Sequence, residues 1–272
     1  MKHQNRTLSL SIVSGKGGVG KTNLSLNLSY ALFQAAQNTL LVDCDLGLAN
    51  LDVMLGISPE KNLNDILNNE VRAEDIIYNL ENNGLGLIPA TSGVTDILDL
   101  DEDQQMQIIQ RMENLLYKYN FLLLDVGAGI SRTVRAFCQM THKQVVIITP
   151  EPTSLTDGYA LIKVLHTRQY IDDFHILVNM VDSEKEARLG FERIKGACAK
   201  FLQLDVGYLG HVQNDPSVLD AVRKQTPFLK FAPRSRASRD IMNVAEKLMQ
   251  LRSNSMQHIA TVPPLRMGEP VS

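Results

Sequence analysis

A glycine-rich octapeptide near the start of the chain could bind phosphate. Residues 15–22 read Gly-Lys-Gly-Gly-Val-Gly-Lys-Thr and match G-x-x-x-x-G-K-[ST], the phosphate-binding loop of nucleoside triphosphatases. Glycines let backbone N–H groups turn toward phosphate oxygens, where a side chain would block the approach. Lys21 could reach the β- and γ-phosphates, and Thr22 could offer its hydroxyl to Mg²⁺. The loop therefore predicts a nucleotide site. Its residues are Gly15, Lys16, Gly17, Gly18, Val19, Gly20, Lys21 and Thr22.

The loop contains a second lysine at a position that the general pattern leaves open. Lys16 directly follows the first glycine. It could be an ordinary solvated lysine on the surface. It could also act on nucleotide held by a second subunit, since arginine fingers supplied by a partner do the same electrostatic work.

Three aspartates end or closely follow apolar runs that read as strands. Asp125 follows four apolar residues, the arrangement of a Walker B segment, and we expect it to bind Mg²⁺ through a water molecule. Asp45 is the candidate for positioning the attacking water, because phosphoryl transfer depends mainly on positioning and charge. Asp43 could support the water shell of Mg²⁺ or could merely cap a turn. For Asp125, the alternative to a role in Mg²⁺ binding is an ordinary carboxylate at a turn that follows its strand.

Strands and helices alternate along the chain and would bring these residues to one edge. Continuous apolar runs suit strands that are covered on both faces, and repeated strand–helix units predict a doubly wound, mostly parallel α/β sheet. Ligands of such sheets bind at the carboxyl ends of the strands, where the loop and the aspartates fall. The expected strands are 7–14, 40–43, 85–89, 121–125, 145–149, 176–181 and 206–212. The expected helices are 22–37, 102–119, 131–140, 154–167, 183–201, 216–224 and 238–251.

Composition agrees with one soluble α/β domain. The chain has 272 residues, 44% of them hydrophobic, and a net charge of −3, so there is no global basic field for nucleic acid. The three cysteines lack metal-ligand spacing, and no apolar run approaches the ~20 residues that span a bilayer. We expect a cytoplasmic protein, with residues 1–252 as a single P-loop ATPase domain. Residues 253–272 read as a flexible tail, since Pro263 and Pro264 oppose a long helix.

These segments together resemble the MinD/ParA family of ATPases, whose phosphate-binding loop (the deviant Walker A motif) carries an early lysine. Residues 43–52 (DCDLGLANLD) are similar to the first switch segment of that family and residues 125–130 (DVGAGI) to the second. Residues 151–157 (EPTSLTD) and 178–180 (VNM) match in order and spacing. The strings point to the FlhG/FleN (YlxH) branch, which regulates flagellar number and placement. Many relatives have Thr-Pro where this chain has Val126 and Gly127.

The resemblance implies an ATP-dependent homodimer with slow hydrolysis. Lys16 would cross the dimer interface. The catalytic residues would be Lys16, Lys21 and Asp45, and the Mg²⁺ residues would be Thr22, Asp43 and Asp125. Asn179 matches the position that reads adenine, because a carboxamide can both donate and accept, although a turn asparagine is the alternative. Asp215 would lie near the adenine and ribose, or would cap a helix.

The expected function is a dimerisation switch that acts on flagellar regulators or switch-complex proteins. One alternative is a protein that positions the division site, as MinD does. Another is a protein that partitions cargo or DNA, as ParA does. A metabolic kinase is the most remote alternative. The tail could contact a membrane peripherally, although it has few basic residues. We do not expect DNA binding, because the best basic cluster lies beside acidic neighbours. That cluster is Arg223, Lys224, Lys230, Arg234, Arg236 and Arg239.

Overall fold

The computed structural model describes residues 5–45, 50–68, 70–81, 84–90 and 102–266. Its centre is an eight-stranded sheet in the order β3-β4-β2-β5-β1-β6-β7-β8. Every neighbouring pair is parallel except β3 and β4, which are antiparallel. The strands are β1 (Leu8–Ser14), β2 (Thr39–Cys44), β3 (Tyr78–Glu81), β4 (Leu85–Ile88), β5 (Phe121–Ala128), β6 (Lys143–Ile148), β7 (Phe174–Val181) and β8 (Gly207–Gln213).

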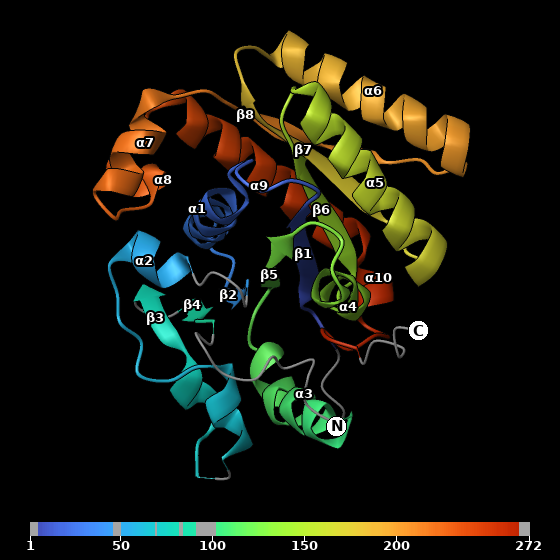
Figure 1. Ribbon diagram of the computed structural model, residues 1–272. Coiled ribbons are helices and arrows are strands. Elements are labelled where there is room, and N and C mark those ends of the chain that lie inside the picture. Colours follow the sequence, from blue (N-terminus) through green and yellow to red (C-terminus); the bar gives the residue numbers. More distant parts are fainter. Residues whose placement is uncertain (1–4, 46–49, 69, 82–83, 91–101, 267–272) are drawn as a thin grey trace.

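Helices cover both faces of this sheet (Figure 1). The described helices are α1 (Lys21–Gln34), α2 (Leu51–Leu55), α3 (Glu102–Leu116), α4 (Arg132–Met140), α5 (Pro152–Gln169), α6 (Glu184–Leu202), α7 (Pro216–Arg223), α8 (Phe228–Phe231), α9 (Arg236–Asn254) and α10 (Met256–Ile259). Short 3₁₀ turns occupy Leu63–Leu67 and Ala73–Ile76.

Two hydrophobic cores lie on opposite faces of the sheet. One core packs the strands against α3, α4, α5 and α6, and the other packs them against α1, α8 and α9. Strand β5 shows how the sequence does this, because successive side chains of a strand point to opposite faces. Leu122 and Leu124 enter the first core, whereas Phe121 and Leu123 enter the second. This two-sided burial is why the run FLLL is continuously apolar.

The predicted α/β, doubly wound, mostly parallel sheet is confirmed, and each of the seven expected strands is present within a few residues. Strand β3 was missed. Its residues are exposed or half-buried and form no continuous apolar run, as befits an antiparallel strand at the edge of the sheet. The expected helix 238–251 is longer at both ends, as α9.

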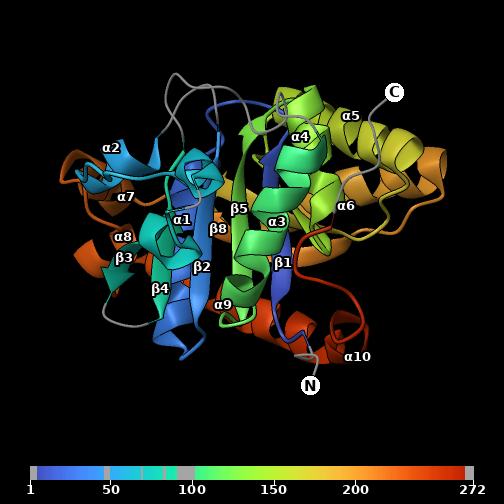
Figure 2. The same ribbon diagram turned by 90° about the horizontal axis from the view of Figure 1, so that it is seen from below.

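The expectation of a loose tail from residue 253 does not fit the part of it that the structure describes. Helix α9 continues to Asn254, α10 follows, and Ile259 is fully buried. The Asn5 side chain donates a hydrogen bond of 2.7 Å to the carbonyl of Val262, and Leu265 packs against the first core. Figure 2 shows α10 close to the start of β1. Apolar side chains thus dock this segment, while residues 267–272 lie outside the described residues.

Candidate nucleotide-binding site

The phosphate-binding loop connects β1 to α1, as its position in the sequence predicts. Gly20 has φ of +85°, which favours glycine, and a Cβ atom there would lie 2.5 Å from the Asn179 side-chain nitrogen. A Cβ atom on Gly15 would lie 2.1 Å from the carbonyl oxygen of Asp157. Gly15 and Gly20 are therefore required by the close packing of α5 and β7 against the loop. Helix α1 begins at Lys21, so its N-terminal N–H groups face the loop.

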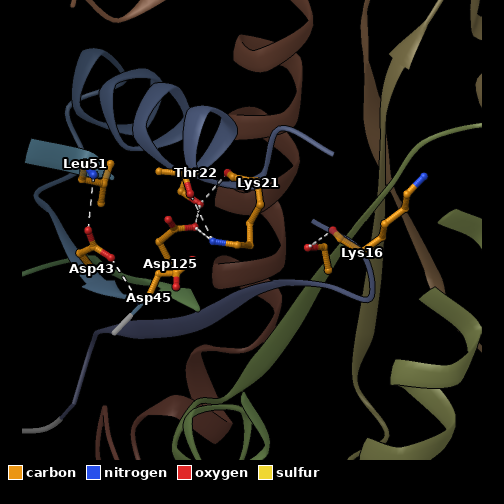
Figure 3. A network of polar contacts seen from close by, with 9 residues as sticks. Lys16, Lys21, Thr22, Asp43, Asp45, Leu51 and Asp125 are labelled. Carbon is orange, nitrogen blue, oxygen red and sulfur yellow. Dashed lines mark hydrogen bonds and ion pairs between the residues drawn. The ribbon is translucent and has the colours of Figure 1, made fainter. Parts of the chain in front are cut away.

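Asp125 and Lys21 form a buried ion pair at the centre of the site (Figure 3). The Lys21 Nζ donates to Asp125 Oδ1 at 2.8 Å, and the two side chains are 7% and 0% exposed. The register of the sheet explains the placement, because Asp125 lies beside Asp43 on β2 and beside Ile12 on β1. Lys21 also lies 3.3 Å from the Thr22 hydroxyl. The second carboxylate oxygen of Asp125 is buried and has no hydrogen-bond partner among the described residues.

Asp43 is a buried carboxylate next to this pair. Its Oδ1 accepts the backbone N–H of Asp45 at 3.1 Å, and its Oδ2 accepts that of Leu51 at 3.4 Å. Burial, together with the charge of Asp125, raises the pKa of Asp43 to about 7, and the two backbone donors oppose this only in part. Asp43 therefore links the backbone at Asp45 to the start of α2. Its contribution to a Mg²⁺ water shell stays a prediction.

Asp45 faces the second switch segment across the site. A Cβ atom on Gly127 would lie 3.4 Å from Asp45 Oδ1, so the carboxylate rests against a residue without a side chain. Strand β5 extends through Gly127 to Ala128, and the N–H of Gly129 bonds to the carbonyl of Ser14 at 2.9 Å. Gly127 is thus a place where the two switch segments meet. Residues 46–49, which follow Asp45, lie outside the described residues.

Lys16 does not join this cluster. Its Nζ lies 3.0 Å from Glu151 Oε2 and 3.0 Å from the Thr153 hydroxyl, and its side chain is 39% exposed. Figure 3 shows the ammonium groups of Lys16 and Lys21 pointing in different directions. The structure thus brings Lys21, Thr22 and the three aspartates together, whereas the Lys16 side chain points away from them toward Glu151.

Asn179 lies beneath the loop. Its side-chain nitrogen donates to the carbonyl of Val19 at 2.8 Å, and the residue is 6% exposed. The amide therefore braces the loop, and the adenine-reading role stays a prediction. Asp215 caps α7, because its side chain accepts from the N–H of Ser217 at 3.0 Å and also from the N–H of Arg236 at 2.9 Å. The capping alternative is the one that the structure supports.

The sequence analysis did not single out two partners in this site. Ser25 lies one helical turn after Lys21, and its hydroxyl is 2.7 Å from Asp125 Oδ1. The spacing of four residues places both side chains on one face of α1, and that signal could have found it. Glu151, the partner of Lys16, was noted only as part of a motif.

Comparison with known proteins decides the family. A family model described as an AAA domain matches residues 7–175. The chain is 36% identical over 239 residues to the antiactivator FleN of Pseudomonas aeruginosa, covering 88% of this chain and 85% of FleN. It is 34% identical over 248 residues to the flagellum site-determining protein YlxH of Helicobacter pylori, covering 91% and 83%. The septum site-determining protein MinD from Pyrococcus horikoshii, solved in complex with Mg-ADP, superposes with a TM-score of 0.73 at 26% identity, covering 90% and 97%.

The chain belongs to the MinD/ParA family of P-loop ATPases. As a member of this family it is an ATPase, near the FlhG/FleN branch. Its described helices include none that is long and apolar enough to cross a membrane.

The side chains of this MinD/ParA-type site fit Mg-ATP. In the described part of the chain, no group of three or more His, Cys, Asp and Glu side chains could hold a metal ion. Mg²⁺ in P-loop enzymes takes few protein ligands beside phosphate and water. The unpartnered oxygen of Asp125 is an acceptor for such a water. Lys21 would hold phosphate, Thr22 would ligate the metal, and the bound ion would stabilise charge on the phosphates.

Proposed function

We propose that this ATPase is a nucleotide-driven dimerisation switch that regulates flagellar number or placement. The observation that supports it best is the similarity to FleN and YlxH, at 36% and 34% identity over most of each chain. The Mg-ADP complex of MinD is a more distant relative, at 26% identity, and its name refers to the septum. Division-site positioning is therefore the second candidate.

Lys16 supports the dimer part of the proposal. It lies in the loop, is partly exposed, and among the described residues its ammonium is held by an ion pair between exposed groups and by one hydroxyl. Such a pair contributes on the order of 0–1 kcal/mol, so little opposes its release. In the proposed dimer, Lys16 of each subunit leaves Glu151 and reaches the phosphates in the other subunit.

Inside one subunit, the proposed cycle depends on an exchange of partners. Lys21 turns from Asp125 to the β- and γ-phosphates, and Asp45 positions the attacking water. Thr22 and Asp125 would hold Mg²⁺ and its water. Because Asp43 bonds to the N–H groups of Asp45 and Leu51, changes at the metal position reach α2 and the surface beside it. This surface is where a flagellar regulator or switch-complex protein would sense the nucleotide. We place the protein in the cytoplasm. Peripheral contact with the membrane is compatible with this placement and is tested by the vesicle pelleting described below.

The test is the mass in solution of the Asp45→Ala protein, measured by light scattering after size exclusion with Mg-ADP and with Mg-ATP. We expect a monomer with Mg-ADP and a dimer with Mg-ATP. A monomer in both states would contradict the switch. A deletion strain should show an altered number or position of flagella, and a strain with normal flagella would contradict the flagellar role. Vesicle pelleting and DNA retardation with each nucleotide would reveal a MinD-like or a ParA-like activity instead.

A further inference from the structure

Ser25 is a buried hydroxyl beside the nucleotide site. It lies in the second turn of α1 and has no exposed surface. Its Oγ is 2.7 Å from Asp125 Oδ1 and 3.0 Å from the carbonyl oxygen of Lys21. A hydroxyl has one proton to donate, and a carboxylate is a stronger acceptor than a carbonyl. The bond to Asp125 is therefore the principal one.

The two oxygens of Asp125 differ in their surroundings. Oδ1 accepts from both Lys21, at 2.8 Å, and Ser25. Oδ2 is buried and has no partner in the described part of the structure. A buried acceptor without a partner costs free energy, unless a donor such as a metal-bound water arrives when the site is filled. The carboxylate is thus anchored at one oxygen and open at the other.

We propose that Ser25 is the positioning residue for Asp125 in Mg²⁺ binding. The inference rests on the nucleotide site of the proposed function. When Lys21 turns to phosphate, Asp125 loses its cation, and the Ser25 hydroxyl keeps Oδ1 in place. Oδ2 then stays directed at the water shell of the metal. Ser25 can do this because its position is fixed by the helix backbone, whereas the long Lys21 side chain moves.

Helix α1 also provides a matched control. Ser29 is likewise fully buried, but its hydroxyl bonds to the carbonyl of Leu26 at 2.7 Å within the helix. Ser25→Ala and Ser29→Ala remove the same atom from the same helix, and only the first removes a contact to Asp125. Ser25→Thr keeps the hydroxyl at the tested position.

The experiment measures binding of a fluorescently labelled ADP by each full-length variant, in a titration with Mg²⁺ and separately with EDTA. For Ser25→Ala we expect the half-saturating Mg²⁺ concentration to rise about 10–100-fold, the range seen when outer partners of metal ligands are removed. Affinity in EDTA should stay at the wild-type value. Ser29→Ala should match the wild type in both conditions, and Ser25→Thr should restore most of the Mg²⁺ response. Thermal melting without nucleotide confirms that each variant is folded.

Two results would overturn the proposal. One is a Mg²⁺ response of Ser25→Ala equal to that of Ser29→Ala. The other is an equal loss of affinity with Mg²⁺ and with EDTA, which would mean a structural role only. Failure of the proposed function is distinguishable, because it would appear in the wild-type protein as the absence of an ATP-dependent dimer or of a flagellar phenotype, whatever Ser25 does.

Discussion

Replacement of Lys21 should destabilise the nucleotide-free protein in addition to preventing nucleotide binding. Its ammonium lies 2.8 Å from Asp125 Oδ1, and both side chains are almost completely buried. At an effective dielectric constant of about 20, this separation corresponds to an attraction of about 6 kcal/mol, much of which offsets the cost of desolvating the two charges. Lys21→Met leaves the Asp125 carboxylate buried without its cation. Breaking a buried pair in this way costs about 3–5 kcal/mol.

Thermal melting without nucleotide measures this cost. In a domain of this size, a loss of that magnitude should lower Tm by roughly 6–20 °C. Lys21→Met combined with Asp125→Asn removes both charges, and Ser25 can still donate to the amide oxygen. We therefore expect the double variant to melt well above Lys21→Met, although it too cannot bind nucleotide. The difference between the single and double variants isolates the coupling of the two residues.

The reasoning fails if the Tm of Lys21→Met lies within about 1 °C of the wild-type Tm. Such a shift corresponds to a loss of less than ~0.5 kcal/mol in the free energy of unfolding, which is typical of a surface substitution. It also fails if the double variant melts at or below the temperature of Lys21→Met, because the unpaired Asp125 charge would then not be the cause. A further requirement is that labelled ADP binds to neither variant. Retained affinity would contradict the role of Lys21 in the phosphate-binding loop.

Three further predictions concern the neighbouring residues. The pKa of Asp43 is raised from 3.8 to about 7, so the folded state holds this proton more tightly than the unfolded state. The stability of the nucleotide-free protein should therefore fall as the pH rises from about 4 to about 7. Asp43→Asn should make Tm less dependent on pH in this range. Lys16→Gln should still bind labelled ADP but lose the ATP-dependent dimer in light scattering, and a normal dimer would contradict the transfer of Lys16 to the other subunit. Asn179→Ala removes a hydrogen bond to Val19 worth about 1 kcal/mol. Equal weakening of ATP and GTP binding would mean that the side chain only supports the loop, whereas the predicted adenine reading requires a selective loss of ATP binding.

The fold was predictable because its strands are buried on both faces. Runs such as FLLL in β5 are typical of strands that are covered on both faces, and their alternation with helical segments indicates a parallel sheet. Strand β3 lacks this signal because it lies at the edge and is half-exposed. The docking of residues 253–266 was missed for a related reason. A few apolar side chains such as Ile259 make no periodic pattern, and their burial depends on a surface formed by distant segments.

The site was predictable in its residue types and less so in its contacts. The loop motif placed Lys21 and Thr22, and the ends of two apolar runs placed Asp43 and Asp125, because adjacent parallel strands bring their carboxyl ends to one edge. A motif does not specify rotamers. The direction of Lys16 toward Glu151 depends on an exposed ion pair, and the brace from Asn179 to Val19 joins residues 160 positions apart.

The ion pair between Lys21 and Asp125 also sets a condition for nucleotide binding. Lys21 can give its ammonium to phosphate only if the charge of Asp125 finds another partner, since a lone buried carboxylate is costly. Mg²⁺ with its water supplies that partner, so we expect nucleotide and metal to stabilise each other's binding. Burial, and after it the charge of Asp125, raises the pKa of Asp43 to about 7, so a second negative charge beside Asp125 is itself unfavourable in this site. Labelled ADP should therefore bind much more weakly in EDTA than with Mg²⁺, and Asp125→Asn, which removes the charge, should reduce this difference.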